Sequence, residues 1–156
     1  MSGGHGHEDH SGRYARHGND MQRLLEIWES AVRATHHFLS ANEIIRIRQF
    51  VPQALRTVPS LLVACDEKGD PAGFMGIDGH RLEMLFISDE YRGKGIGRQL
   101  LCYGIDRHAV DALTVNEQNP QARAFYEAMG FTVCGRSETD EQGGPYPLLY
   151  MRRQVR

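Results

Sequence analysis

The sequence predicts one domain of mixed α/β (α+β) class, with a mostly antiparallel central sheet of six to seven strands and about four helices on its faces. Three observations support this prediction. The chain has 156 residues, and 40% of them are hydrophobic, which is enough for one core of ordinary size. Short apolar segments follow one another through the middle of the chain, separated by tight polar turns. Amphipathic helical patterns precede and follow these segments.

The first twelve residues, MSGGHGHEDHSG, are polar and low in complexity. We expect residues 1–12 to be a disordered tail, and residues 13–156 to form the domain. The clustered His5, His7 and His10 leave one alternative, an adventitious divalent-metal site, because imidazoles suit nickel, copper and zinc. No metal site is predicted in the domain itself.

Two helices are expected in the first third of the domain, after a short strand at residues 13–16. The first is predicted to be capped by Asp20, because apolar residues recur at helical spacing at Leu24, Leu25, Trp28 and Val32. The second is expected from Ala41 to about Phe50, and its apolar side is predicted to carry Ile44, Ile45 and Ile47.

Three strands in an antiparallel meander are predicted next, at residues 60–66, 71–78 and 81–87. Residues 67–70 are expected to form the first hairpin turn, and Gly79 and His80 the second. Simple alternation in the third, central strand places Leu82, Met84 and Phe86 on one face. It places Arg81, Glu83, Leu85 and Ile87 on the other face.

The last third is predicted to continue as helix, strand, helix and two strands. The first of these helices carries its apolar face at Leu100, Leu101, Ile105 and Ala109. A short strand follows at residues 112–115. The second helix opens at Pro120, places Ala124, Phe125 and Ala128 inward, and ends at Gly130. The final strands are expected at residues 131–136 and 147–153, joined by a polar loop.

Composition excludes several classes of protein. A net charge of -2 gives no basic field for nucleic acid. No apolar run approaches eighteen residues and no export signal opens the chain, so we expect no membrane association. Three scattered cysteines, Cys65, Cys102 and Cys134, are expected as reduced thiols in a cytoplasmic protein.

The segment after the central strand, RGKGIGR at residues 92–98, has a glycine at every second position. Glycines permit positive φ and close approach, so consecutive N–H groups can converge on an anion at a helix start. The dinucleotide fingerprint fails here because Arg98 interrupts its glycine spacing, and the Walker loop fails because no Gly-Lys precedes Ser or Thr. A phosphate group is nevertheless the expected ligand.

Two motifs resemble those of the GNAT superfamily of N-acetyltransferases. Arg92, Gly95 and Gly97 fill the pattern [Arg/Gln]-x-x-Gly-x-[Gly/Ala] of its acetyl-CoA pyrophosphate loop. The second pattern, N-x-x-A-x-x-F-Y-x-x-x-G-F, is filled by Asn119, Ala122, Phe125, Tyr126, Gly130 and Phe131. The order of predicted elements also resembles the GNAT fold, and the stretches ATHHFLS, VNEQN and GRSETDEQGGPYPLLY are similar to the YjaB-type group of small bacterial members.

The resemblance implies an enzyme that transfers the acetyl group of acetyl-CoA to a primary amine by direct attack in a ternary complex. It implies a pantetheine arm along the backbone of Leu85, Phe86 and Ile87, where the central strand splays from the next one, and an arm contact from Asn119. The pyrophosphate is expected among Arg92, Gly93, Lys94, Gly95, Ile96, Gly97 and Arg98.

Acetyl transfer needs a proton donor for the departing thiolate and a proton acceptor for the amine. Tyr126 is the candidate acid, because a phenol titrates near ~10, close to an alkyl thiol; the alternative is a tyrosine packed against the sheet. Glu83 is the candidate base, and an ion pair with Arg81 is an equally weighted alternative. His80 has a better intrinsic pKa but is expected in a turn.

The acceptor pocket implied by the resemblance carries His36, Phe38, His80 and Tyr146. A solvated or capping role for the histidine at position 36 remains an alternative. The sequence leaves the acceptor open between a small molecule and a protein, and the oligomeric state open between monomer and homodimer. A non-catalytic CoA or acyl-CoA sensor is the alternative function, which the presence of Tyr126 disfavours, since a sensor needs no proton donor.

Overall fold

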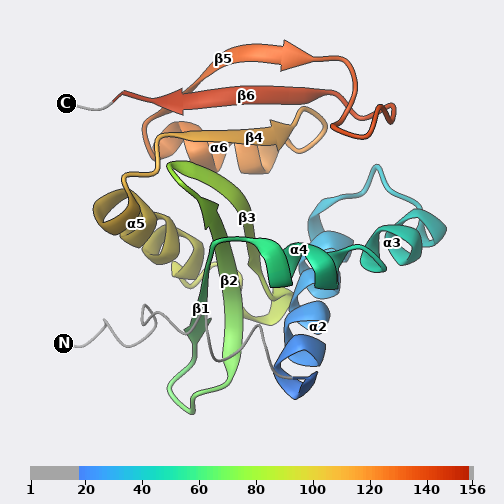
Figure 1. Cartoon of the computed structure of the whole chain (residues 1–156), viewed down its shortest axis with the longest axis vertical. Coiled ribbons are helices and arrows are strands. Elements are labelled where there is room, and N and C mark those ends of the chain that lie inside the picture. Colours follow the sequence, from blue (N-terminus) through green and yellow to red (C-terminus); the bar gives the residue numbers. More distant parts are fainter. Residues whose placement is uncertain (1–17, 155–156) are drawn as a thin grey trace.

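The computed structural model describes residues 18–154. The predicted strand at residues 13–16 and the tail at residues 1–12 lie outside the described residues. The described strands form a six-stranded sheet in the order β1-β2-β3-β4-β6-β5 (Figure 1). Their bounds are β1 Ser60–Cys65, β2 Pro71–Asp78, β3 Arg81–Ile87, β4 Ala112–Asn116, β5 Phe131–Ser137 and β6 Leu148–Arg153. Neighbouring strands are antiparallel except β3 and β4, which confirms the predicted mixed class.

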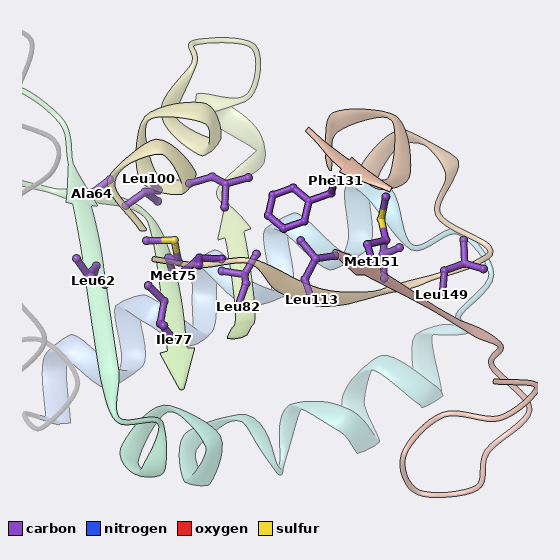
Figure 2. Packing of buried hydrophobic residues seen from close by; sticks show 13 residues of the cluster. Leu62, Ala64, Met75, Ile77, Leu82, Leu100, Leu113, Phe131, Leu149 and Met151 are labelled. Carbon is purple, nitrogen blue, oxygen red and sulfur yellow. The ribbon is translucent and has the colours of Figure 1, made fainter. Parts of the chain in front are cut away.

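Helices cover both faces of the sheet (Figure 1). On one face, α2 (Gly18–Thr35), α3 (Ala41–Arg48) and α4 (Val51–Thr57) bury a cluster with Leu24, Trp28 and Phe74. On the other face, α5 (Ile96–His108) and α6 (Pro120–Ala128) cover a second cluster with Leu62, Leu113 and Phe131 (Figure 2). A short 3₁₀ helix, η2 (Asp89–Tyr91), links β3 to α5. No helix among residues 18–154 is long and apolar enough to cross a membrane.

The predicted helices at the start of the domain are partly wrong. Helix α2 includes Gly18, so Asp20 lies within it and is not its cap. The second predicted helix corresponds to α3, which ends at Arg48, but α4, which begins at Val51, was not predicted. Helix α4 has seven residues and one buried side chain, Leu55, so it is too short to show a recognisable helical periodicity. Ile45 lies 54% exposed rather than on the apolar side of α3.

Two apolar faces in the second half are also corrected. Ala109 is exposed and ends α5 in a left-handed conformation, with φ of 54°. The buried residue there is the next one, Val110. In α6, Ala124 and Ala128 are exposed. The face that packs on the core carries Ala122, Phe125, Tyr126 and Met129.

The central strand β3 contains a β-bulge that breaks the predicted alternation. Leu82 pairs with Ile77 and Met84 pairs with Gly76, so Glu83 is an extra residue without a partner on β2. Leu82 consequently faces the α5 side with Ile77 and Leu113, as Figure 2 shows. Met84 and Phe86 face the opposite cluster. The prediction that Leu82, Met84 and Phe86 share one face is therefore wrong.

Candidate active site

The parallel strands β3 and β4 separate after two residue pairs. Arg81 pairs with Ala112 and Leu82 with Leu113, and within these two strands no further pair follows. Strand β4 stays paired with β6 along its whole length, so the edge of β3 beyond Leu82 is open. The bulge at Glu83 stands where the separation begins, a common use of bulges beside active sites. The expected splay of the central strand is therefore present.

Two cavities share walls at this gap. The larger has a volume of about 330 Å³ and reaches Ile87, Arg92 and Gly97. The smaller has a volume of about 140 Å³ and reaches Glu83 and Asn116. Six residues line both cavities: His36, Leu85, Phe86, Asn119, Ala122 and Tyr126. The gap between β3 and β4 thus has two sides that meet at a common wall.

The start of α5 has a glycine-rich backbone and no capping side chain. Gly93 and Gly95 have φ of 79° and 82°, values that L side chains rarely adopt. Gly95 is the N-cap and has no capping side chain, so the first-turn N–H groups of α5 have no side-chain acceptor from it. Gly97 faces the larger cavity, where an added Cβ would lie 3.6 Å from Ile87 and 3.8 Å from Phe125. Backbone therefore forms this end of the cavity.

The cationic side chains of the loop, those of Arg92, Lys94 and Arg98, lie in three different surroundings. Arg92 lines the larger cavity, donates to Asp89 Oδ1 at 3.1 Å and lies 3.5 Å from Gln121 Oε1. The Lys94 ammonium lies 5.6 Å from the centre of the Tyr91 ring. Arg98 lies apart from them: it lines a groove on the outer side of α5 with Cys102 and Tyr103, so the structure does not bring it to the gap.

Asn119 and Tyr126 reach the gap from α6. Asn119 is buried and caps the helix, because its Oδ1 accepts from the N–H of Ala122 at 3.2 Å. Tyr126 packs against Phe125 and Phe131 at ring distances of 5.3 and 6.1 Å. Burial raises the pKa of the Tyr126 phenol above its ordinary value of 10.0, so the phenol stays protonated at neutral pH and is a weaker acid than an exposed tyrosine.

Glu83 lines the smaller cavity and also forms the ion pair that was its alternative role. Its Oε2 lies 3.0 Å from Nε of Arg81. Desolvation raises the pKa of the Glu83 carboxyl, while Arg81 lowers it and Glu141 and Asp78 raise it further. The carboxylate is therefore destabilised by its surroundings and partly compensated by its cation.

Three of the four predicted acceptor residues form a chain of aromatic contacts. The His36 and Phe38 rings lie 5.3 Å apart, and the Phe38 and Tyr146 rings 6.1 Å apart. The Tyr146 hydroxyl donates to Glu43 of α3. This chain links the end of α2 to the loop between β5 and β6.

His80, the fourth predicted acceptor residue, lies elsewhere. It occupies the turn between β2 and β3, with Nδ1 3.1 Å from the carbonyl oxygen of His108 at the end of α5. It lines neither cavity at the gap. The β2–β3 turn was expected to bring His80 near the acceptor. It instead holds His80 at the start of β3, beside the end of α5.

Several residues at the gap were not predicted as site residues. They are Ala31, Thr35, Thr114, Asn116, Gln121, Ala122 and Phe125. Ala122 and Phe125 already stood in the second motif, and Thr35 stands in the ATHHFLS stretch, so their signal was present in the sequence. Asn116 stood in the VNEQN stretch, whereas Thr114 carried no such signal, because only the strand separation exposes it. Within residues 18–154 no group of three or more metal-binding side chains converges.

Comparison with known proteins identifies the class. Residues 35–150 match the family described as acetyltransferase (GNAT) domain. The chain belongs to the GNAT family and is an N-acetyltransferase.

Similar proteins agree with this assignment. Over 137 residues the chain is 42% identical to the peptidyl-lysine N-acetyltransferase YjaB of Salmonella typhimurium, covering 88% of this chain and 93% of that protein. The solution structure of apo YjaB from Escherichia coli matches with a TM-score of 0.80 and 37% identity over 96% of each chain. The PaiA N-acetyltransferase of Thermoplasma acidophilum, in complex with coenzyme A, shares the fold, with a TM-score of 0.65 and 21% identity over 88% of this chain and 94% of that one.

Proposed function

We propose that this N-acetyltransferase transfers the acetyl group of acetyl-CoA to the side-chain amine of a lysine in a protein, by direct attack in a ternary complex. The two cavities that meet at the β3–β4 gap carry the proposal, because they give each reactant its own side and one common wall. The name of the YjaB relative, a peptidyl-lysine N-acetyltransferase, supports the choice of acceptor.

The larger cavity suits acetyl-CoA, which supplies an activated acetyl thioester. The bare first turn of α5 and the glycine backbone can accept the pyrophosphate, and Arg92 stands beside them. The open edge of β3 at residues 85–87 can bind an amide-bearing arm as a sheet edge binds a peptide. Asn119 uses its oxygen as a helix cap, so its side-chain NH₂ remains a donor toward the same arm. The PaiA enzyme, which has this fold, was solved with coenzyme A.

The smaller cavity suits an amine on a slender chain. Its lining includes the polar side chains of Glu83, Thr114 and Asn116. A lysine side chain is an aliphatic stem with a terminal amine, which fits a narrow cavity better than a branched acceptor does. The peptide backbone would lie outside it, between α3 and the β5–β6 loop, where Tyr146 contacts Glu43.

Tyr126 is proposed as the acid that protonates the departing thiolate, because it lies on the wall common to both cavities. Glu83 is a candidate for the amine proton on the acceptor side. Cys65, Cys102 and Cys134 are reduced cysteines, which suit a reducing compartment, so we place the reaction in the bacterial cytoplasm. The enzyme is proposed to act as a monomer or a homodimer.

A direct assay tests the function. The purified protein is mixed with acetyl-CoA and a peptide that has a blocked N-terminus and one lysine, and both CoA thiol release and peptide mass are measured. We expect release that matches an added acetyl group on the lysine. The control is the same peptide with its lysine already acetylated, which should release nothing. Acetylation of small amines or of free N-termini, but not of lysine peptides or proteins, would contradict the lysine assignment.

A further inference from the structure

His36 occupies a fixed position at the end of α2. Its backbone N–H donates to Val32 O at 2.8 Å, and its carbonyl accepts from Leu39 N at 3.1 Å. The ring is partly buried and packs against Phe38. Both hydrogen bonds hold the residue where the helix ends, so the position of its ring is set by the fold rather than by an exposed loop.

The contacts of the ring select one tautomer. Oγ1 of Thr35 donates to the carbonyl oxygen of Ala31 at 2.8 Å, and Oγ1 also lies 2.8 Å from Nδ1 of His36. A hydroxyl has one proton, and a carbonyl cannot donate. Both contacts are hydrogen bonds only if Nδ1 of His36 carries the proton and donates to Oγ1. In the neutral ring, Nε2 is then an acceptor with a free lone pair.

One other titratable residue lines both cavities together with His36. Of the six residues that line both cavities, His36 and Tyr126 are the two that titrate. Glu83 lines the smaller cavity and Arg92 the larger one, but neither lines both. A group that accepts a proton during transfer must reach the place where the two reactants meet, and His36 satisfies this requirement better than Glu83.

Several charged or titratable groups surround the ring. His37 is its neighbour in sequence, and three more line a cavity together with it: Glu83 of β3, Tyr126 of α6 and Arg92 of the loop before α5. Beyond Phe38 stand Tyr146 and Glu43. Desolvation, and then the charge of His37, lower the pKa of the His36 imidazole from 6.5, so the ring is neutral at pH 7.

We propose that Nε2 of His36 is the general base that removes the proton from the attacking amine; this rests on the proposed acetyl transfer. The amine nitrogen bonds to the thioester carbonyl carbon, the carbon–sulfur bond breaks, His36 takes one amine proton and Tyr126 gives its proton to the sulfur. Solvent then removes the proton from His36 and returns one to Tyr126, so the products are the amide and CoA thiol. A nitrogen that is forming a bond to a carbonyl carbon is more acidic than a free ammonium, so a weak base suffices.

Kinetic variants test this role. His36→Gln keeps a polar side chain and should lower kcat by roughly 10²- to 10⁴-fold with little change in CoA affinity. The matched control is His80→Gln, an exposed histidine in the β2–β3 turn that lines neither cavity at the gap, which should stay within about twofold of the parent. Thr35→Val removes the acceptor for Nδ1 and should cost on the order of tenfold, while Thr35→Ser should retain the parent rate.

Chemical rescue separates a base from a structural residue. Added imidazole should restore part of the activity of His36→Ala, and the rescued rate should rise with pH as free imidazole becomes neutral. The role is overturned if His36→Gln stays within about threefold of the parent, or if Glu83→Gln loses the activity instead.

Nitrogen NMR tests the chemistry without turnover. We expect His36 at pH 7 to show a protonated Nδ1 and an unprotonated Nε2, and Thr35→Val to weaken this preference. A ring that is charged at pH 7, or protonated on Nε2, would overturn the base role even if lysine acetylation is confirmed. The expected spectrum together with no turnover on any amine would instead reject the proposed function.

Discussion

At the scale of single residues, desolvation acts on the two titratable groups of the common wall in opposite directions. It raises the pKa of Tyr126 and lowers that of His36, because in each case burial disfavours the charged form. One group therefore remains a neutral proton donor and the other a neutral proton acceptor near pH 7. Two groups whose environments separate their protonation in this way are suited to acid and base roles in one site.

Tyr126→Phe removes one hydroxyl and almost no volume, so it tests the acid alone. Acetyl transfer should fall by roughly 10²- to 10⁴-fold while CoA affinity changes little. Steady-state rates and calorimetry measure the two effects. Tyr103→Phe, on the outer groove of α5, is the matched control and should be fully active. A fully active Tyr126→Phe enzyme would remove Tyr126 from the mechanism and leave water as the acid.

His36 should also make stability depend on pH. Its pKa is lower in the folded protein than the ordinary 6.5, so the unfolded chain binds the proton more readily. Its contribution to the free energy of unfolding is therefore largest above about pH 6.5 and decreases as the pH falls toward the folded-state pKa. Denaturant unfolding at about pH 7.5 and about pH 5 should show a larger loss of stability in the parent than in His36→Gln. Equal losses would mean that His36 titrates normally in the folded state.

At the scale of elements, we propose that the backbone at the start of α5 binds the phosphate. Gly95 is a poor position for a test, because its φ of 82° would strain any side chain. Gly97 has ordinary helical space, so Gly97→Ala should bind CoA and gain up to about 1 kcal/mol of stability. Gly97→Val places more atoms in the larger cavity and should weaken CoA binding by about tenfold or more without unfolding the protein. Calorimetry with CoA measures both, and unchanged binding by Gly97→Val would mean that the arm lies elsewhere.

The two main errors in the predicted elements have local physical causes. Helix α4 is too short to show helical periodicity, and Pro52 in its first turn resembles a break in the sequence. The bulge at Glu83 cannot be recognised in the sequence RLEMLFI. Residues 84–87 are all apolar, so their hydrophobic pattern is the same with or without the shift in register. Packing against two different helical layers, not the residue pattern, decides which of them faces α2 and which faces α5.

At the scale of the whole molecule, both hydrophobic clusters use the same sheet. Strands β1, β2 and β3 contribute side chains to each cluster, as Leu61 and Leu62 on β1 illustrate. Loss of either cluster would remove one support of these strands, so we expect a single cooperative unfolding transition. Differential scanning calorimetry should show one peak for the full chain.

Deletion of residues 1–12 should leave that transition and the CoA affinity unchanged, because the described clusters draw on residues between Met21 and Met151. A second measurement with EDTA covers the alternative role of the tail. A large loss of stability on deletion would show that the tail contributes to the fold, and a matching loss with EDTA would show that it does so through a metal.

The sequence by itself determined the class of protein and suggested the residues that are proposed for the cofactor site. Local structure requires these residues: a backbone turn requires the glycines at positions 95 and 97, and a capped helix requires the motif from Asn119 to Phe131. Their spacing can therefore be recognised in the sequence without a structure. The antiparallel meander of β1, β2 and β3 and the helices on the faces of the sheet also followed from periodicity and turn residues, whereas the position of β6 between β4 and β5 was not predicted.

Only the tertiary structure decided which residues meet. His80 and His36 both stood among the predicted acceptor residues, yet the β2–β3 turn ties His80 to the end of α5, while the end of α2 brings His36 to the wall shared with Tyr126. Glu83 forms a bulge opposite β2 at the point where β3 leaves β4. These outcomes depend on long-range strand pairing and on packing between layers, and neither is encoded in the spacing of nearby residues.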